Sequence, residues 1–231
     1  MPDILLPTRM GMSKGISSST RRYFVDRFYA SHSGIFSQAN AILDVGGTKG
    51  KKRGQFDIAT CSQRVTILNI DAEKGADIVC DAASMPVADN IYDVIICAEV
   101  LEHVRYPEKV LSEIARVCKP GGKIFLTAPF LFPVHADPYD FRRYTDVCWK
   151  DMTAQAGLEI VEIQPQGNFY TVLMDMLRMW IYNKVGNKVL RYSLYFLIRP
   201  FITLSIRSSD KVSDRFVGSF TTGYAVIARK P

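Results

Sequence analysis

The sequence lacks the features of a secreted, membrane-spanning or metal-stapled chain. Its five cysteines are odd in number and scattered without zinc-type spacing, which indicates reduced cytoplasmic thiols and predicts no metal site. No stretch holds about 18 uncharged apolar residues, so a spanning helix is not expected. The first residues show no apolar run of a secretory signal. With 48% hydrophobic and 23% charged residues, the 231-residue chain is not disordered, and it can bury a core without disulfides or metal ions.

Positive charge is abundant but unevenly spread. The net charge of +6 divides into +3 for residues 1–40, −4 for residues 41–164 and +7 for residues 165–231. An acidic middle between basic ends indicates two tasks in one chain. The basic residues alternate with aliphatic runs and no RNA-binding motif is visible, so a nucleic-acid partner is not expected.

Strand and helix patterns alternate through the acidic middle. This order predicts a parallel sheet with helices on both faces. The stretch 168–222, which separates the last two expected strands, is far longer than a hairpin connection. The expected strands are 41–45, 65–70, 78–80, 92–98, 123–128, 158–163 and 224–228, and the expected helices are 20–30, 107–118 and 145–156.

Acidic residues and glycines follow the expected strands at their carboxyl ends, where a doubly wound sheet binds ligands. Asp44 lies in the first strand, which runs into Gly46 and Gly47, where the backbone can approach a ligand closely. Asp71 ends the second strand, where a carboxylate accepts both hydroxyls of a ribose. Asp81 ends the third, where an acceptor can take an adenine amino group. The pattern predicts a nucleotide-type site.

Three successive motifs carry a family resemblance across residues 41–164: LDVGG, DAASMPVADNIYDVIICAEVLEHV and EIARVCKPGGKIFLTAPF. The chain resembles the class I S-adenosylmethionine-dependent methyltransferases, in the branch of type 11 methyltransferase domains. Two further segments, PFLFPVHADPYDFRRYT and AGLEIVEIQPQG, look like methyltransferases of bacterial surface-polysaccharide or antibiotic biosynthesis.

The resemblance implies an α/β fold: a doubly wound, Rossmann-like, seven-stranded mixed sheet with the last strand antiparallel and a helical insertion between the last two strands. It also implies S-adenosylmethionine as methyl donor and S-adenosylhomocysteine as product. The implied donor contacts are Gly46 and Gly47 at the methionine moiety with Asp44 behind them, Asp71 and Ala72 at the ribose, Asp81 and Ala82 at the adenine, and Cys97, Ala98 and Glu99 under the sulfonium.

The glycine loop departs from the family pattern. The family usually has Gly-x-Gly-x-Gly, and this chain has Thr48 in place of the middle glycine. Threonine disfavours a positive φ, so the loop is expected to follow a different path. Residues 49–54 are unusually basic, and the helix after the first strand is expected to be short or displaced.

The acceptor residues are expected on the loop after the fifth strand. His135 is the candidate catalytic base, because its unperturbed pKa lies near neutrality. Tyr139, Arg142 and Arg143 are candidates for an acceptor wall, with a structural ion pair between Asp140 and Arg143 as the alternative. His103 is a candidate acceptor contact, with helix capping or support of the site as the alternative.

We therefore expect a cytoplasmic methyltransferase that methylates an oxygen of a sugar, glycoconjugate or related small molecule. The alternatives are an inactive scaffold with a degenerate fold, or a methyltransferase acting on RNA or a lipid. The expected segments are an N-terminal helical cap (1–40), the donor-binding domain (41–167 with 223–231) and the insertion (168–222). The insertion is expected to be an acceptor lid, a homodimer interface, or a contact with the inner face of the membrane through residues 168–206.

Overall fold

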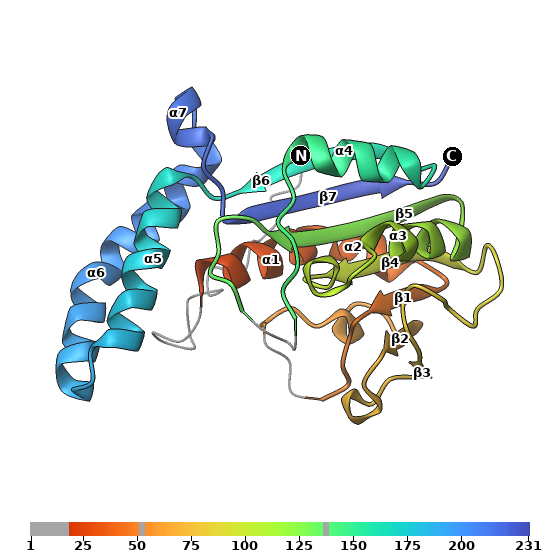
Figure 1. Cartoon of the computed structure of the whole chain (residues 1–231), viewed down its shortest axis with the longest axis horizontal. Coiled ribbons are helices and arrows are strands. Elements are labelled where there is room, and N and C mark those ends of the chain that lie inside the picture. The colour runs from red at the N-terminus through yellow and green to blue at the C-terminus, as the bar shows by residue number, and fades with distance from the viewer. Residues whose placement is uncertain (1–18, 51–53, 136–138) are drawn as a thin grey trace.

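The computed structural model describes residues 19–50, 54–135 and 139–231 (Figure 1). A seven-stranded sheet forms the centre, and a pair of long helices projects from one end of it. The elements are α1 (Thr20–Ser31), α2 (Ser33–Gln38), β1 (Ile42–Val45), η2 (Ile58–Thr60), β2 (Val65–Asn69), η3 (Ala72–Lys74), β3 (Ile78–Val79), β4 (Tyr92–Ala98), η4 (Leu101–His103), α3 (Pro107–Val117), β5 (Cys118–Pro129), α4 (Asp146–Gln155), β6 (Glu159–Gln166), α5 (Phe169–Lys184), α6 (Lys188–Ser208), η5 (Ser209–Lys211), α7 (Arg215–Gly218) and β7 (Gly223–Arg229), where η marks a 3₁₀ turn.

The sheet has the strand order β3-β2-β1-β4-β5-β7-β6. The first five strands run parallel, whereas β7 lies antiparallel between β5 and β6. The predicted fold class is confirmed: a mixed seven-stranded sheet with an antiparallel last strand and a helical insertion before it. Strand order reverses beside β1, so the carboxyl ends of β1, β2 and β4 lie together at one edge.

Two cores lie on opposite faces of the sheet, because successive residues of each strand point to opposite sides. Along β4, Ile95 and Cys97 pack into one core with α3 and α4. Val94 and Ile96 pack into the other with α1 and α2. Every second residue of the same short strand is therefore buried on each side, as expected of a doubly covered parallel sheet.

Helix α3 and strand β5 meet without a loop, which differs from the expected boundary. The apolar face of α3 is fully buried as predicted, from Val110 to Val117. The Pro120-Gly121-Gly122 run was expected to end the helix before a strand beginning near residue 123. It lies instead inside β5, which begins at Cys118. Gly121 has φ +77°, so the strand accommodates an irregular start that a side chain would disfavour.

The connection from β1 to β2 contains no α-helix within the described residues 46–50 and 54–64. The Thr48 hydroxyl instead accepts a hydrogen bond from the Gly50 amide at 3.1 Å and donates one to the Lys74 carbonyl, also at 3.1 Å. The Lys49 amide bonds to the same carbonyl at 3.0 Å. These contacts fasten the loop to η3, so the loop follows a different path, as predicted. The expected short or displaced α-helix is absent from the described residues.

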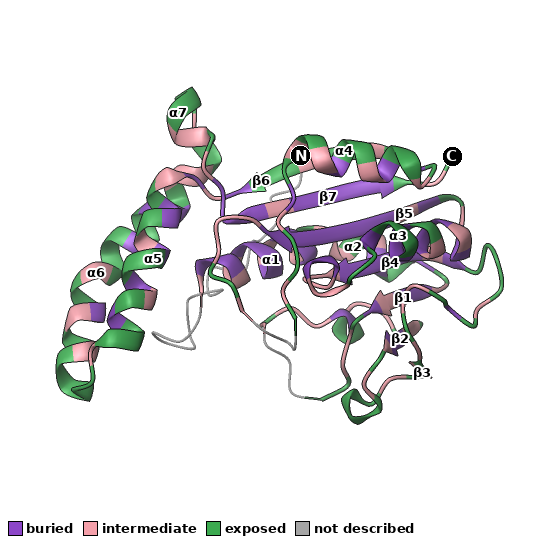
Figure 2. Cartoon of the chain, viewed as in Figure 1, coloured by how far each residue is buried: buried purple, intermediate pink, exposed green. Residues whose placement is uncertain are grey.

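The insertion folds mainly as an antiparallel pair of helices, α5 and α6, which we call the α5–α6 hairpin. A capping box begins α5, in which the Asn168 side chain accepts from the Thr171 amide and Thr171 accepts from the Asn168 amide. Helix α6 continues through Pro200. Figure 2 shows most of the hairpin exposed.

The sequence predicted no spanning helix, and the composition of α6 bears on that prediction. By length and composition alone, the helical stretch Lys188–Lys211 is long and apolar enough to cross a bilayer. Only 22% of its most apolar window is buried. A core helix of similar composition would be mostly covered, so this apolar surface lacks the burial that a soluble fold normally provides.

Candidate donor and acceptor site

The glycine loop after β1 lies against β2 and β4. The Gly46 amide donates to the Leu68 carbonyl at 2.7 Å, and its φ of +78° requires glycine. A Cβ at this position would collide with the Val100 side chain, and a Cβ on Gly47 would collide with the Asp44 carboxylate. The loop therefore packs tightly on its neighbours at the predicted position. Gly46 and Gly47 have no side chains that would keep a ligand away from their backbone.

The predicted ribose and adenine carboxylates lie at the ends of the next two strands. Asp71 caps η3 by accepting from the Glu73 amide at 2.9 Å, and its side chain stays partly exposed. Asn69 donates to the Gly47 carbonyl at 2.8 Å and ties this strand end to the glycine loop. Asp81 accepts from the Ala83 amide at 2.9 Å and is exposed. Ala72 and Ala82 each follow their carboxylate directly.

The predicted contacts at the end of β4 divide into two kinds. Cys97 is fully buried, which raises the pKa of its thiol far above the usual value, so it is not a nucleophile at neutral pH. Ala98 is half-buried beside it. Glu99 has φ +55°, and its carboxylate turns toward Arg21 and away from open solvent.

Arg21 is a site residue that the sequence did not reveal. It lies on α1, is 2% exposed, and holds both oxygens of Glu99, with Nε at 3.1 Å and Nη2 at 2.5 Å. Its Nη1 donates to the Gln166 side chain at the end of β6. Burial acts to raise the pKa of Glu99, but the opposite charge and hydrogen bonds of Arg21 lower it overall, so Glu99 is ionised.

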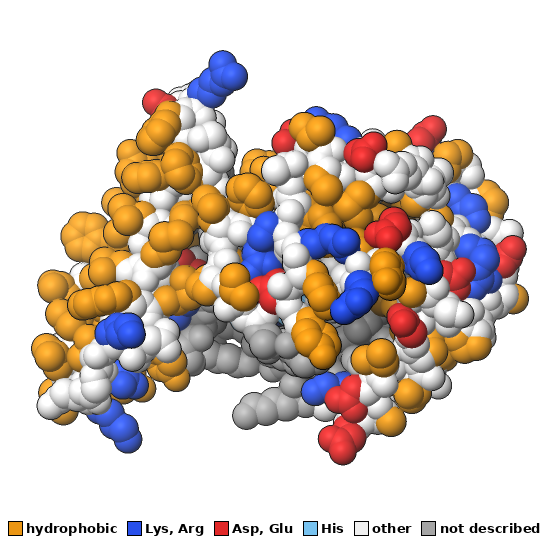
Figure 3. Space-filling view, in the orientation of Figure 1, with side chains coloured by type: hydrophobic (Ala, Val, Ile, Leu, Met, Phe, Trp, Pro, Cys, Tyr) orange, Lys and Arg blue, Asp and Glu red, His pale blue; other side chains and the backbone are white. Residues whose placement is uncertain are grey.

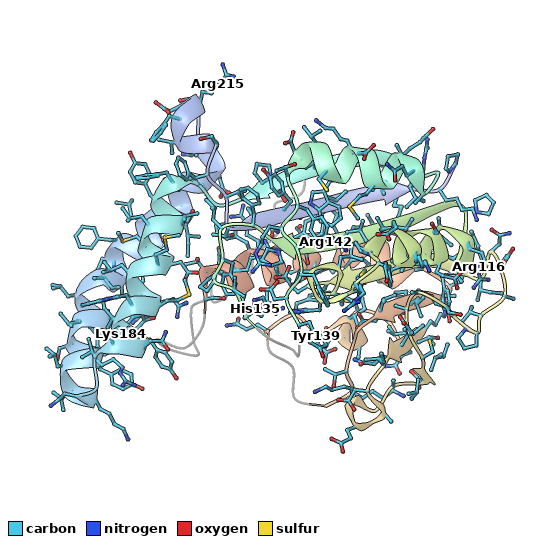
Figure 4. The ribbon with its side chains drawn as sticks, in the orientation of Figure 1. Arg116, His135, Tyr139, Arg142, Lys184 and Arg215 are labelled. Atoms are coloured by element: carbon cyan, nitrogen blue, oxygen red, sulfur yellow. The ribbon has the colours of Figure 1, made fainter. Side chains whose placement is uncertain are left out.

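We call the sheet edge formed by the carboxyl ends of β1, β2 and β4 the donor edge. Three side chains converge beside it, and we call them the Glu102–His103–His135 cluster. Glu102 and His103 follow β4 on η4, and His135 comes from the loop after β5, where Figure 4 shows it at the same edge as Tyr139. The imidazole rings lie 4.9 Å apart in an edge-to-face arrangement. The cluster is close to the donor edge because Val100, two residues before Glu102, packs on Gly46.

Glu102 is the fully buried member of the cluster. It is 0% exposed, and neither carboxylate oxygen has a hydrogen-bond partner among the described residues. Burial, followed by the negative charge of Glu99, raises its pKa to about 8. The Nε2 atom of the His103 ring lies 3.6 Å from Oε1 of Glu102.

The two histidines are oriented by acceptors at their other ring nitrogen. His103 Nδ1 lies 2.6 Å from the Tyr139 carbonyl. His135 Nδ1 lies 3.3 Å from the Pro133 carbonyl and 3.2 Å from Asp140 Oδ2, and the His135 backbone amide donates to the same Asp140 oxygen at 2.9 Å. A carbonyl oxygen only accepts hydrogen bonds, so Nδ1 of each ring is the donor in these contacts and Nε2 is the nitrogen left to face the cluster.

The remaining acceptor candidates hold the loop or face solvent. Arg143 donates with both terminal nitrogens to Asp140, and also to the Pro133 carbonyl at 3.1 Å, so the alternative of a structural ion pair is observed. The Arg143 hydrogen bonds hold the pKa of Asp140 at about 2. Arg142 donates to the Arg105 carbonyl at 2.7 Å, and the Tyr139 side chain is exposed.

Comparisons with known proteins agree with this geometry. A family model for a methyltransferase domain matches residues 43–126. The chain is 27% identical over 178 residues to the demethylmenaquinone methyltransferase of Renibacterium salmoninarum, covering 73% of this chain and 69% of that one. It is 30% identical over 150 residues to the ubiquinone/menaquinone biosynthesis C-methyltransferase of Idiomarina loihiensis, covering 56% and 57%. The match thus spans between somewhat more than half and about two thirds of these relatives.

A solved structure shows the same fold. The SAM-dependent methyltransferase from Archaeoglobus fulgidus has a TM-score of 0.56 at 16% identity, over 90% of this chain and 94% of that one. The predicted fold is confirmed: residues 43–126 match the model of a methyltransferase domain, and the chain has the fold of a solved methyltransferase that depends on S-adenosylmethionine. The narrower resemblance to polysaccharide and antibiotic enzymes stays a prediction.

Proposed function

We propose that this protein transfers the methyl group of S-adenosylmethionine to an oxygen of a lipid-linked glycoconjugate or a related acceptor at a membrane surface. The observation that carries the proposal is the Glu102–His103–His135 cluster beside the donor edge. In the transfer, the acceptor oxygen attacks the methyl carbon, the carbon–sulfur bond breaks and S-adenosylhomocysteine leaves. The hydroxyl proton passes to solvent through the cluster, in which His135 is the catalytic group.

The donor part of the proposal rests on the strand ends. The donor sulfonium is already activated, so positioning supplies much of the rate. In this proposal Gly46 and Gly47 contact the methionine moiety, with Asp44 behind them, and Asp71 accepts from the ribose hydroxyls; the tight glycine loop and the position of Asp71 after β2 support it. The Arg21–Glu99 pair carries no net charge, so it supports the loop without attracting or repelling the cationic donor.

Replacing Asp71 with alanine is expected to weaken donor binding by well over tenfold, because two hydrogen bonds to a charged carboxylate contribute about 1.5–3 kcal/mol each. The measurement is isothermal calorimetry with S-adenosylhomocysteine. Asp57→Ala is the matched control, because Asp57 caps η2 by the same kind of contact, to the Ala59 amide at 2.9 Å. Equal loss in both variants would point to lost capping and would refute the ribose contact.

The membrane part of the proposal rests on the α5–α6 hairpin. More than half of the exposed large hydrophobic side chains in the described residues lie on these two helices, among them Trp180, Phe196 and Phe201 at 58–60% exposure. Figure 3 shows this apolar surface covering the hairpin, with basic side chains at its tip. Lys184 and Lys188 flank the turn between the helices. Aromatic side chains beside basic residues suit an interface with anionic lipid.

Flotation with vesicles containing anionic lipid tests this surface. The triple variant Trp180→Glu, Phe196→Glu, Phe201→Glu is expected to lower the membrane-bound fraction by at least about tenfold, since each buried aromatic contributes roughly 1.5–3 kcal/mol. The control is Tyr106→Glu, because Tyr106 is 50% exposed outside the hairpin. Equal partitioning of the triple variant and the wild type would exclude a membrane role and leave the lid or the dimer interface.

A second candidate function is methyl transfer to a ring carbon of a quinone, favoured by the names of the two relatives. A quinone carries an apolar tail, so the hairpin suits it equally. Mass spectrometry of a strain lacking the protein separates the two. A glycoconjugate lighter by one CH₂ supports the first, and a quinone lighter by one CH₂ supports the second. An unchanged melting temperature with donor and with product would instead indicate an inactive scaffold.

A further inference from the structure

We propose that Glu102, His103 and His135 together bind one divalent first-row transition-metal ion that holds the acceptor oxygen for methylation. This inference rests on the proposed function, because it assigns a cofactor to the same acceptor site. One ligand atom from each residue can be chosen so that all three lie within 4.8 Å of one another. Ligands about 2.1 Å from a metal lie roughly 3.5 Å apart in a tetrahedral site, so a contraction of about 1 Å completes the geometry.

The buried carboxylate of Glu102 points to the ligand that is needed. Both of its oxygens are without a hydrogen-bond partner among the described residues, and the side chain is fully buried. A buried polar group in this condition is costly unless something satisfies it. The described neighbours do not supply a cation at bonding distance, since Arg21 is engaged by Glu99 and Arg143 by Asp140. A metal ion would satisfy the carboxylate directly.

The histidine rings are prepared in the manner of metal ligands. A ligating histidine usually donates its other ring N–H to a carbonyl or a carboxylate, which fixes the tautomer and the ring orientation. His103 has the Tyr139 carbonyl in this role, and His135 has the Pro133 carbonyl, with the Asp140 carboxylate 3.2 Å from the same nitrogen. His103 Nε2 is directed to Glu102 Oε1 at 3.6 Å, too long for a hydrogen bond but short enough for one ion to join them.

The donor set also indicates the class of metal and its task. Two imidazoles and one carboxylate suit zinc, iron(II) or manganese better than magnesium, which prefers oxygen ligands. Three protein ligands leave a position for the acceptor oxygen. The ion lowers the pKa of the bound hydroxyl, whose proton passes to solvent; the oxygen then takes the methyl group and S-adenosylhomocysteine leaves. His135 then acts on the acceptor through the ion.

Metal binding is measured on the tag-free protein, stripped with a chelator, without donor or acceptor. Calorimetric titration with ZnCl₂ and with MnCl₂ is expected to show one site per chain, and MgCl₂ at least tenfold weaker binding. Glu102→Gln keeps the shape of the side chain and is expected to weaken zinc or manganese binding at least tenfold. His32→Ala is the control, because His32 lies on the opposite face of the sheet and contacts the Phe28 carbonyl.

Two outcomes overturn the metal site: no binding by the wild type, or equal binding by the wild type and Glu102→Gln. Thermal denaturation without metal verifies that the variants are folded. Titration with S-adenosylhomocysteine separates this inference from the proposed function. A protein that binds the product but no metal refutes only the metal site. A protein that binds the metal but not the product refutes the methyltransferase proposal.

Discussion

Replacing Arg21 with alanine is expected to lower the free energy of unfolding by about 3–5 kcal/mol, because it leaves the carboxylate of Glu99 buried without its partner. The guanidinium is almost fully buried, bonds both Glu99 oxygens and reaches Gln166 on β6. It thereby joins α1 to the ends of β4 and β6. Urea denaturation, followed by circular dichroism, gives the free energy.

Arg27→Ala is the matched control for Arg21, on the same helix. Arg27 pairs with Asp210 at 2.8 Å in an exposed position, so its loss is expected to cost about 0–1 kcal/mol. The double variant Arg21→Met, Glu99→Leu removes both charges, and its stability is expected to lie above that of Arg21→Ala. Equal stability of Arg21→Ala and Arg27→Ala would show that the buried pair is not the connection described above.

Replacing His135 with alanine is expected to lower turnover about 10²–10⁴-fold while donor affinity stays nearly unchanged, because its cluster acts on the acceptor proton. His135 contacts Asp140 and the His103 ring, and has no described contact with the glycine loop. Turnover is measured as transfer of labelled methyl from S-adenosylmethionine into a membrane extract of a strain that lacks the protein.

His32→Ala again provides the control for this experiment, with turnover expected to equal that of the wild type. A His135→Ala variant with normal turnover would remove this residue from the mechanism. A variant that also loses donor affinity would indicate a collapse of the edge shared by β1 and β4, and Asp140→Asn would then be expected to do the same. Calorimetry with S-adenosylhomocysteine decides between these results.

Much of the donor half could be predicted from the sequence because it depends on local order. A short apolar strand followed by Gly46 and Gly47 specifies a tight loop, and a carboxylate after each of the next strands specifies the same sheet edge. The different path of the glycine loop at Thr48 could also be predicted, because a β-branched residue avoids the positive φ that glycine permits. The parallel part of the confirmed sheet then follows from the alternation of strands and helices.

The limits of local patterns appear at Pro200 and Pro120. A proline in a helix removes one hydrogen bond, but packing of α6 on α5 through Tyr195 and Ile202 favours one continuous helix. Pro120 was expected to end the preceding helix, whereas pairing of β5 with its neighbours extends the strand across it. In both cases tertiary contacts outweigh a local preference of a few kcal/mol.

The sequence by itself determined the fold class: strand and helix periods, glycines and carboxylates are encoded within short windows, and residues 43–126 match the model of a methyltransferase domain. Only the tertiary structure decided what lies around the donor edge. Arg21 pairs with Glu99, and His135 lies near Glu102, although the members of each pair are far apart in the chain. Spacing along the chain carries no signal for such pairs, because the sheet, and not the local backbone, brings them to one edge. The same holds for the hairpin, since its apolar pattern is that of a core helix until the fold leaves it uncovered.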